Sequence, residues 1–389
     1  MGFISLLADV ASEMLYPVIP VYLKSIGFSI LLIGVLEGVV NFLAGISKGY
    51  FGKKSDEIGL RLPFVKWGYL LSAISKPLLT ALVLPIWVFS IRSMDRLGKG
   101  VRTAARDALL SQQAEPEHKG KVFGFHRAMD TTGAAIGPII ALIFLYFNEG
   151  HYEQLFLLAF IPGLLSVALI FTLKEEKQPQ PKLIKGSFFS YLKYWKVAPE
   201  KFKRAMPGLM LFMLFNSADI FLLLITKDSI GVREIEFGNA HFGADSITIA
   251  AYIFYNLIYA LFSYPLGSLA DKLGYRLVLV GGFLIYGIVY AGFSIGPSIG
   301  MIFGLFFLYG IYAAATEGIT KAWISNLANT NQKATAIGFY TSLESIGALF
   351  ASSIAGVIWM SAGPGWTFII PAIASIITSV YLAYFLKNS

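Results

Sequence analysis

Apolar runs of about 20 residues, separated by short polar breaks, recur along the whole chain of 389 residues. A run of that length crosses the hydrocarbon core of a bilayer as one α-helix, whereas a β-barrel needs alternating segments of about ten residues. The composition agrees, because 56% of the residues are hydrophobic and only 14% are charged. The sequence therefore predicts an all-α integral membrane protein.

The apolar pattern predicts twelve transmembrane helices. We place them at residues 3–24, 29–51, 62–83, 85–108, 121–147, 153–173, 205–226, 245–269, 277–296, 298–322, 333–360 and 366–386. The first run is read as a span, since it lacks a basic leader and a cleavage site and contains Asp9 and Glu13. Most loop Lys and Arg residues fall on one side, so the positive-inside rule places both termini in the cytoplasm. We expect a bacterial inner-membrane location.

The two halves of the chain repeat one another. Gly52, Asp56, Gly59 and Arg61 recur 215 residues later as Gly267, Asp271, Gly274 and Arg276, and Gly124, Phe125, Asp130 and Gly133 recur 214 residues later as Gly338, Phe339, Glu344 and Gly347. A constant offset across two motifs predicts two pseudo-symmetric six-helix bundles, residues 1–173 and 205–389. Residues 174–204 are the predicted cytoplasmic linker, with a possible amphipathic helix on the membrane surface. Its basic residues fit topology and lipid headgroups better than nucleic acid.

The loop motif carries a resemblance to a known family. GSLADKLGYR, from Gly267 to Arg276, matches in full the pattern G-x-x-x-D-[RK]-x-G-x-[RK] of the major facilitator superfamily, and the first copy, GKKSDEIGLR, differs by Glu57. The resemblance covers the whole chain and implies a secondary transporter that works by alternating access. Its motif residues, expected to form a cytoplasmic gate, are Gly52, Asp56, Gly59, Arg61, Gly267, Asp271, Lys272, Gly274 and Arg276. Glu317 and Lys321, spaced i, i+4, are predicted to pair with each other at the same gate.

Two further motifs match the family in part. Arg92 stands where the family pattern R-x-x-x-G-x-G has its arginine, and the fuller string DRLGKGVRTAARDAL looks like that of a prokaryotic subfamily with no secure common substrate. Residues 133–138, GAAIGP, resemble the core of a motif associated with exporters. The resemblance therefore favours export.

Charged residues form a stripe in the fourth predicted helix. At about 100° per residue, Asp95, Arg96, Lys99, Arg102 and Arg106 follow Arg92 on one face. Charges inside a bilayer must face protein or water, so this face, together with His126 and Arg127 of the next helix, predicts an ionic network along the substrate path. Asp9, Glu13 and Asp130 are candidates either to neutralise Arg92 or to bind a coupling proton.

The C-terminal half is more apolar and carries two isolated acids, Asp219 and Glu344. With no adjacent cation in sequence, each is a candidate proton-coupling site. Asn216, Tyr252, Tyr255, Asn256, Tyr309 and Tyr312 are candidates to line a substrate cavity, with plain packing as the equally open interpretation. The mixed charges of residues 227–245 predict a solvated outer loop.

These observations predict a monomeric carrier of a small solute in the lipid bilayer, coupled to protons, with export favoured. Uptake of an organic anion with protons stays open because of the cationic stripe, as does a transport-inactive sensor or scaffold. No enzymatic activity and no cofactor are expected. The sequence has no phosphate-binding G-x-x-x-x-G-K-[ST] loop, and four histidines without cysteine predict no metal site.

Overall fold

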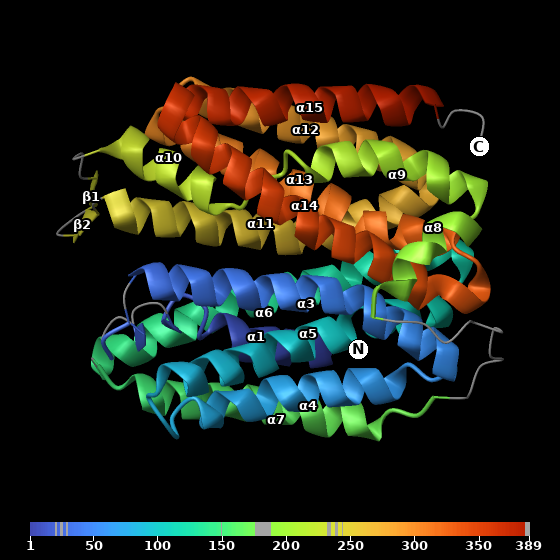
Figure 1. Ribbon diagram of the computed structural model, residues 1–389. Coiled ribbons are helices and arrows are strands. Elements are labelled where there is room, and N and C mark those ends of the chain that lie inside the picture. The colour runs from blue at the N-terminus through green and yellow to red at the C-terminus, as the bar shows by residue number, and fades with distance from the viewer. Residues whose placement is uncertain are drawn as a thin grey trace. The chain divides into compact units, whose positions relative to one another are not determined.

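The computed structural model describes the chain except for residues 20–21, 24–25, 29, 149, 176–187, 232–234, 238–239, 243 and 386–389. Its α-helices are α1 (Gly2–Glu13), α3 (Ile30–Ile58), α4 (Leu62–Leu78), α5 (Pro85–Gln113), α6 (Lys119–Phe147), α7 (Tyr152–Thr172), α8 (Tyr194–Val197), α9 (Glu200–Met213), α10 (Ile220–Ile230), α11 (Ala244–Leu273), α12 (Tyr275–Ser294), α13 (Ile299–Leu327), α14 (Lys333–Ala362) and α15 (Pro364–Phe385) (Figure 1). Short 3-10 helices cover Pro116–His118 (η1), Phe188–Lys193 (η2) and Thr330–Gln332 (η3). The predicted all-α fold is confirmed.

Seven helices of the described residues are long and apolar enough to cross a membrane by length and composition. They run from α6 through α7 and from α11 through α15. The charge stripe on α5 lowers the apolar character of that helix, although it spans 29 residues. A two-stranded antiparallel hairpin, β1 (Ile235–Phe237) and β2 (Ala240–Phe242), lies in the predicted outer loop.

The chain forms two compact units that exchange short segments. The first contains residues 1–116, 129–199 and 321–346, and the second contains residues 117–128, 200–320 and 347–389. The start of α6 thus belongs to the second unit, while the start of α14 belongs to the first. The exchanged segments are the ones that follow the polar turns η1 and η3.

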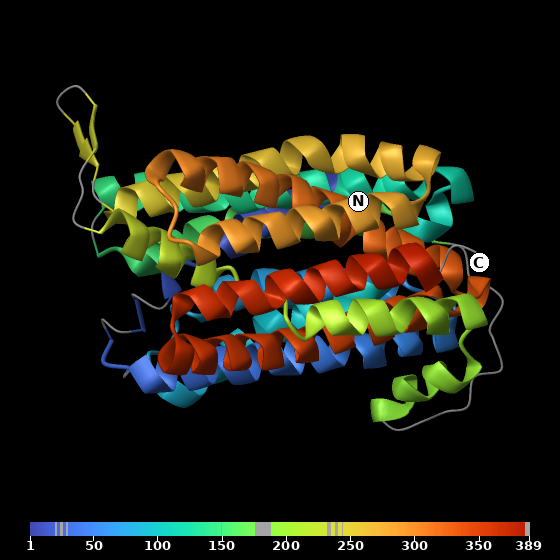
Figure 2. The same cartoon turned by 90° about the horizontal axis from the view of Figure 1, so that it is seen from above.

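Helix packing repeats between the units. In the first unit α7 packs against α1 and α4, and in the second α15 packs in the same way against α9 and α12 (Figures 1 and 2). Each pair joins the last helix of a half to the first and third helices of that half. The shared pairing confirms the two pseudo-symmetric bundles that the sequence repeat predicts.

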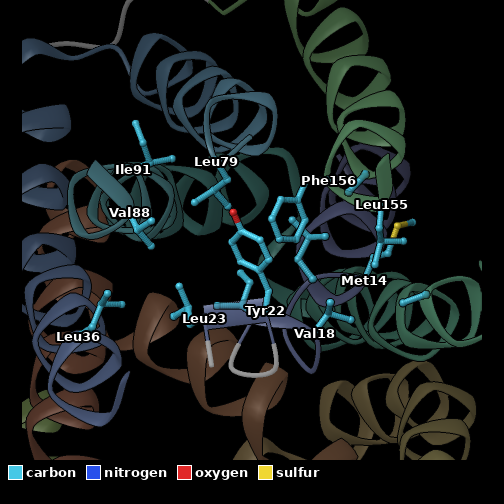
Figure 3. Close-up of a cluster of buried hydrophobic side chains, with 14 of the residues drawn as sticks. Met14, Val18, Tyr22, Leu23, Leu36, Leu79, Val88, Ile91, Leu155 and Phe156 are labelled. Carbon is cyan, nitrogen blue, oxygen red and sulfur yellow. The ribbon is translucent and has the colours of Figure 1, made fainter. Parts of the chain in front are cut away.

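A hydrophobic core fills one end of the first unit (Figure 3). Tyr22 lies at its centre, with its ring edge-on to Phe156 at 4.9 Å between centroids. The core takes Leu36 from the first turns of α3, whereas Asp56 lies 20 residues further along the same helix. At 1.5 Å per residue these positions are about 30 Å apart. The apolar core and the loop motifs therefore occupy opposite ends of the first unit.

Two predicted spans are not continuous helices. The first, residues 3–24, leaves the α-helix after Glu13 and forms turns at residues 14–18, where the ring of Pro17 clashes with the carbonyl four residues earlier. The seventh, residues 205–226, breaks between Met213 and Ile220. There Asn216 and Asp219 offer the backbone competing hydrogen bonds, which the apolar pattern did not reveal. Non-helical backbone at membrane depth is tolerated only where protein or a water-filled cavity surrounds it.

The described part of the predicted linker packs onto the first unit. Tyr191 of η2 is buried against Gly49, where any side chain would overlap its ring, and Ser190 accepts a hydrogen bond from Lys53 at 2.7 Å. Phe189 and Val197 stay exposed on the other side. The segment is therefore amphipathic, as predicted, with its inner face held by α3; residues 176–187 of the linker lie outside the described part.

Candidate functional site

The first loop motif ties α3 to the start of α14. The Asp56 carboxylate accepts hydrogen bonds from the backbone N–H of Thr335 at 2.7 Å and from its hydroxyl at 2.8 Å. Its other oxygen forms an ion pair with Arg61 at 2.8 Å, and both side chains are almost fully buried. A carboxylate stabilises the first turn of a helix, where N–H groups lack intrahelical partners. Glu57, which replaces the family's cation, binds Lys53 and Lys54 instead.

The second loop motif makes the matching contact in the second unit. Asp271 accepts hydrogen bonds from the N–H groups of Gly120 and Lys121, both at 2.7 Å, in the first turn of α6. Tyr275 donates a third bond to it at 2.7 Å. Gly267 is required here because a side chain would overlap the carbonyl of Gly120. Both acids and both helix starts differ by 215 residues, so the repeat extends to individual hydrogen bonds.

The two copies differ in their cations. Arg61 is buried against the acid of its own motif, whereas the acid of the second copy takes a tyrosine hydroxyl in place of the equivalent Arg276. Lys272 is exposed, and Gly59 and Gly274 have positive φ angles of 71° and 92° that glycine adopts without strain.

A buried lysine that the sequence analysis missed lies at the centre of the α5 stripe. Lys76 of α4 forms an ion pair with Asp95 at 3.0 Å, and Ser72 donates a hydrogen bond to the same carboxylate at 2.6 Å. Arg92 reaches the other carboxylate oxygen at 3.7 Å. A single Lys in an apolar run is itself a signal of an intramembrane partner, and that signal could have found the pair.

Further along the stripe, Arg106 is surrounded by acids and a hydroxyl. It pairs with Asp107 at 3.0 Å, lies 3.9 Å from Asp130 and donates a hydrogen bond to Ser5 at 3.0 Å. Lys321, in the segment of α13 that belongs to the first unit, completes the network by pairing with Asp107 at 3.3 Å. The structure thus brings together α1, α5, α6 and α13 through one buried group of charges.

Two other cations of the stripe face aromatic rings. Arg102 is 2% exposed and lies over Tyr69 at 4.4 Å, with its Nε and Nη1 atoms outside hydrogen-bond distance of any acceptor in the described residues. Arg96 lies near the ring of Tyr16 at 5.8 Å. Lys99 is half-buried on the same face. Cation–π contacts stabilise such charges only in part, so Arg102 keeps unused donors.

Asp9 and Glu13 are half-buried on α1 and lie outside ion-pair distance of Arg92 across the described residues. The prediction that either acid holds this arginine is wrong, because the acid one turn along α5 takes that place. Gly133 allows α6 to approach α1 closely, since a side chain there would overlap backbone of α1. This contact places Asp130 within electrostatic reach of Asp9.

Glu317 and Lys321 do not pair with each other. Glu317 forms an ion pair with Arg127 of α6, which also donates a hydrogen bond to Tyr259. Lys321 binds Asp107, as described above. The i, i+4 prediction was wrong because contacts to other helices outweigh a local pair worth only about 0.5 kcal/mol.

Asp219 lies at the break between α9 and α10, surrounded by tyrosines. Tyr309 donates a hydrogen bond to its carboxylate at 2.7 Å, and no Lys, Arg or His of the described chain lies within ion-pair distance. The rings of Tyr255, Tyr312 and Tyr290 pack against Tyr309, with centroids 4.9, 5.3 and 6.4 Å away. We call the following residues the tyrosine cluster: Tyr252, Tyr255 and Tyr259 of α11, Tyr286 and Tyr290 of α12, and Tyr309 and Tyr312 of α13.

Glu344 differs from Asp219 because a cation is close to it. Lys48 of α3 is an electrostatic neighbour and donates a hydrogen bond to the adjacent Ser345 at 3.1 Å. Tyr340 donates to the Glu344 carboxylate at 3.3 Å. Sequence alone could not pair residues that lie almost 300 positions apart.

Other predicted residues have plainer surroundings. Asn256 is buried and donates a hydrogen bond to the carbonyl of Tyr252 one turn earlier on α11. Asn216 lies in the helix break before α10, and His126 is buried on α6. Across the described residues no group of three or more His, Cys, Asp or Glu side chains could hold a metal ion.

Comparison with known proteins places these features in context. The sequence model described as "Major Facilitator Superfamily" matches residues 1–240 and 209–389. An uncharacterised MFS-type transporter of Methanocaldococcus jannaschii is 35% identical over 384 residues, covering 99% of this chain and 93% of the relative. An uncharacterised protein of Mycobacterium tuberculosis is 31% identical over 182 residues, 46% of this chain and 44% of its own length.

Two solved structures share the fold. The human organic anion transporter MFSD10 superposes with a TM-score of 0.75 at 14% identity, covering 98% of this chain and 97% of its own. The Escherichia coli fucose:proton symporter FucP superposes with a TM-score of 0.76 at 13% identity, covering 99% and 96%. At these identities the likeness concerns the fold alone.

Proposed function

Because this chain belongs to the major facilitator superfamily, we propose that it is a proton-coupled secondary transporter that exports a small solute in exchange for protons. It works by alternating access in the cytoplasmic membrane of a prokaryote, with both termini in the cytoplasm. The observation that carries the proposal is Asp219, a carboxylate at a break in a membrane-spanning helix without a cation to neutralise it. Such a group exchanges protons at low cost, and its charge decides whether burial is favourable.

The loop motifs are the proposed gate. Asp56 and Asp271 each hold the first turn of a helix from the opposite half of the sequence, so releasing these bonds frees that end of the molecule to open. The apolar core around Tyr22 closes the other end of the first unit in this state. Alternating access then requires the carboxylate bonds to form and break in each cycle.

The experiment uses purified protein in proteoliposomes that contain a pH-sensitive dye. Ethidium, benzoate and glucose serve as a cationic, an anionic and a neutral probe. Inward movement of an exchanged solute drives protons out, so the lumen becomes alkaline, whereas symport makes it acidic. Solute entry that leaves luminal pH unchanged and ignores an imposed pH gradient overturns proton coupling.

Replacing Asp219 with Asn tests the site within this proposal, with Glu344→Gln as the matched variant. Asp219→Asn should lose accumulation driven by a pH gradient, and Glu344→Gln should retain it because Lys48 already balances that acid. Accumulation by both variants assigns coupling to Asp9, Glu13 or Asp130.

Uptake of an organic anion with protons is the second candidate function. One observation favours it, namely the buried Arg102, whose Nε and Nη1 atoms have no acceptor in the described residues. A guanidinium with unused donors binds carboxylates and phosphates in two-point contacts. Benzoate entry with luminal acidification, lost in Arg102→Gln, is the result that supports this function over export.

A further inference from the structure

The tyrosine cluster is the densest group of aromatic rings around any ionisable side chain described in the second unit. Its rings form one connected network through Tyr255, Tyr309, Tyr312, Tyr286 and Tyr290, with centroid separations from 4.0 to 5.3 Å along the chain of contacts. Each of these five rings is at most 5% exposed. Simple packing accounts for apolar rings, but it does not explain why five buried rings each carry a hydroxyl next to a carboxylate.

Asp219 supplies a negative charge that this network does not neutralise. Tyr309 donates the hydrogen bond to its carboxylate, and tyrosine hydroxyls are polar but uncharged. The buried hydroxyls of Ser217 and Tyr290 have no partner of normal hydrogen-bond geometry in the described residues. Ser217 belongs to the same helix break, so unused polar atoms and an unbalanced charge occur together.

Resting on the export function proposed above, we propose that Asp219 and the tyrosine cluster bind an organic cation, a protonated or quaternary amine with apolar substituents. The carboxylate pairs with the positive charge, while the faces of aromatic rings attract a cation through their quadrupole and also accept apolar groups. An anion would meet repulsion from both. A metal ion fits poorly, because one carboxylate offers too few ligands and no metal-binding group of acids or histidines occurs in the described chain.

The same carboxylate then accounts for exchange. It can hold a proton or the organic cation, and it cannot hold both, because protonation removes the charge that the cation needs. Two kinds of neighbour face it: the acid Glu317 of α13, and tyrosines from three helices. Those tyrosines are Tyr255 of α11, Tyr286 and Tyr290 of α12, and Tyr309 and Tyr312 of α13. Since no cation is among them, lowering the pH weakens binding of the organic cation.

The test measures binding of radiolabelled tetraphenylphosphonium to the purified full-length protein between pH 5 and pH 9. We expect a constant dissociation constant at high pH and a tenfold rise for each pH unit below the ionisation of the carboxyl group. Asp219→Asn should weaken binding at least tenfold at pH 8 and abolish the pH dependence. Tyr290→Leu removes a ring and should weaken binding, and Tyr290→Phe, which keeps the ring, should bind more tightly than Tyr290→Leu.

The controls separate loss of the site from loss of the fold. Asp219→Glu restores the charge and should recover pH-dependent binding, and Glu344→Gln should bind like the wild type. Equal binding by the wild type and Asp219→Asn overturns the proposal, as does equal binding by Tyr290→Leu and Tyr290→Phe.

One outcome separates this proposal from the function on which it rests. If Asp219→Asn still exchanges ethidium but no longer accumulates it in a pH gradient, Asp219 carries protons only. Proton-coupled transport then stands, and the cation site is overturned.

Discussion

The two units treat buried charge in different ways. In the first, acids are matched with cations, as in the pairs of Asp95 with Lys76 and of Asp107 with Arg106. In the second, Asp219 is surrounded by tyrosine rings and takes one hydroxyl as its partner. A carboxylate in a buried ion pair stays charged and holds helices together, because separating the pair is costly. A carboxylate beside neutral hydroxyls is open to a proton or a cation, so the comparison separates scaffold from exchange site.

The largest expected effect tests the scaffold side of this comparison. Lys76→Met leaves Asp95 buried without its closest cation and should lower the free energy of unfolding by about 3 to 5 kcal/mol. Thermal unfolding in detergent measures the loss. The double variant Lys76→Met with Asp95→Asn should recover most of the stability, and Lys201→Met, on the exposed face of α9, should change it little. An unchanged unfolding temperature in Lys76→Met means that Arg92 alone can balance the acid.

A second prediction uses the two copies of the loop motif. Asp56→Asn leaves Arg61 buried beside a neutral amide and should cost about 3 kcal/mol. Asp271→Asn breaks no ion pair of that kind and should cost about 1.5 kcal/mol through weaker bonds to two backbone N–H groups. Unfolding temperatures of the two variants and of the exposed control Lys272→Gln rank these effects.

Transport separates the gate role from stability. Asp271→Asn should slow ethidium exchange while the concentration for half-maximal rate stays within about twofold, because the carboxylate holds helix ends and not the solute. Equal losses of binding and of transport in Asp271→Asn would count against a gate.

The sequence was sufficient for the fold because the relevant signals are local and repeated. Apolar runs predict the helices, and a constant offset between motif copies predicts the paired bundles. The offset even relates two hydrogen-bonded acids, Asp56 and Asp271, and the helix starts that they hold.

Pairing across helices could not be predicted in the same way. Glu344 looks isolated in its own helix, yet Lys48 approaches it from α3, and Glu317 prefers Arg127 of α6 to a lysine one turn away. Such choices depend on which faces meet after folding. The helix break before Asp219 was also missed, since an apolar run fixes how long a span is but not where its backbone stays helical.

The smallest expected effect concerns the one ion pair that the second unit makes with an acid of α13. The side chains of Arg127 and Glu317 are 27% and 41% exposed, in contrast to the buried pairs of the first unit. Glu317 lies ten residues before the end of α13, about 15 Å along the helix, so an exposed charge there must face water. An ion pair in contact with water contributes at most about 1 kcal/mol. Glu317→Gln should therefore shift the unfolding temperature far less than Lys76→Met, and the shift should shrink further at high salt, which screens exposed charges. If Glu317→Gln destabilises the protein as much as Lys76→Met does, at any salt concentration, this part of α13 is sealed from water and the contrast between the two units fails at this pair.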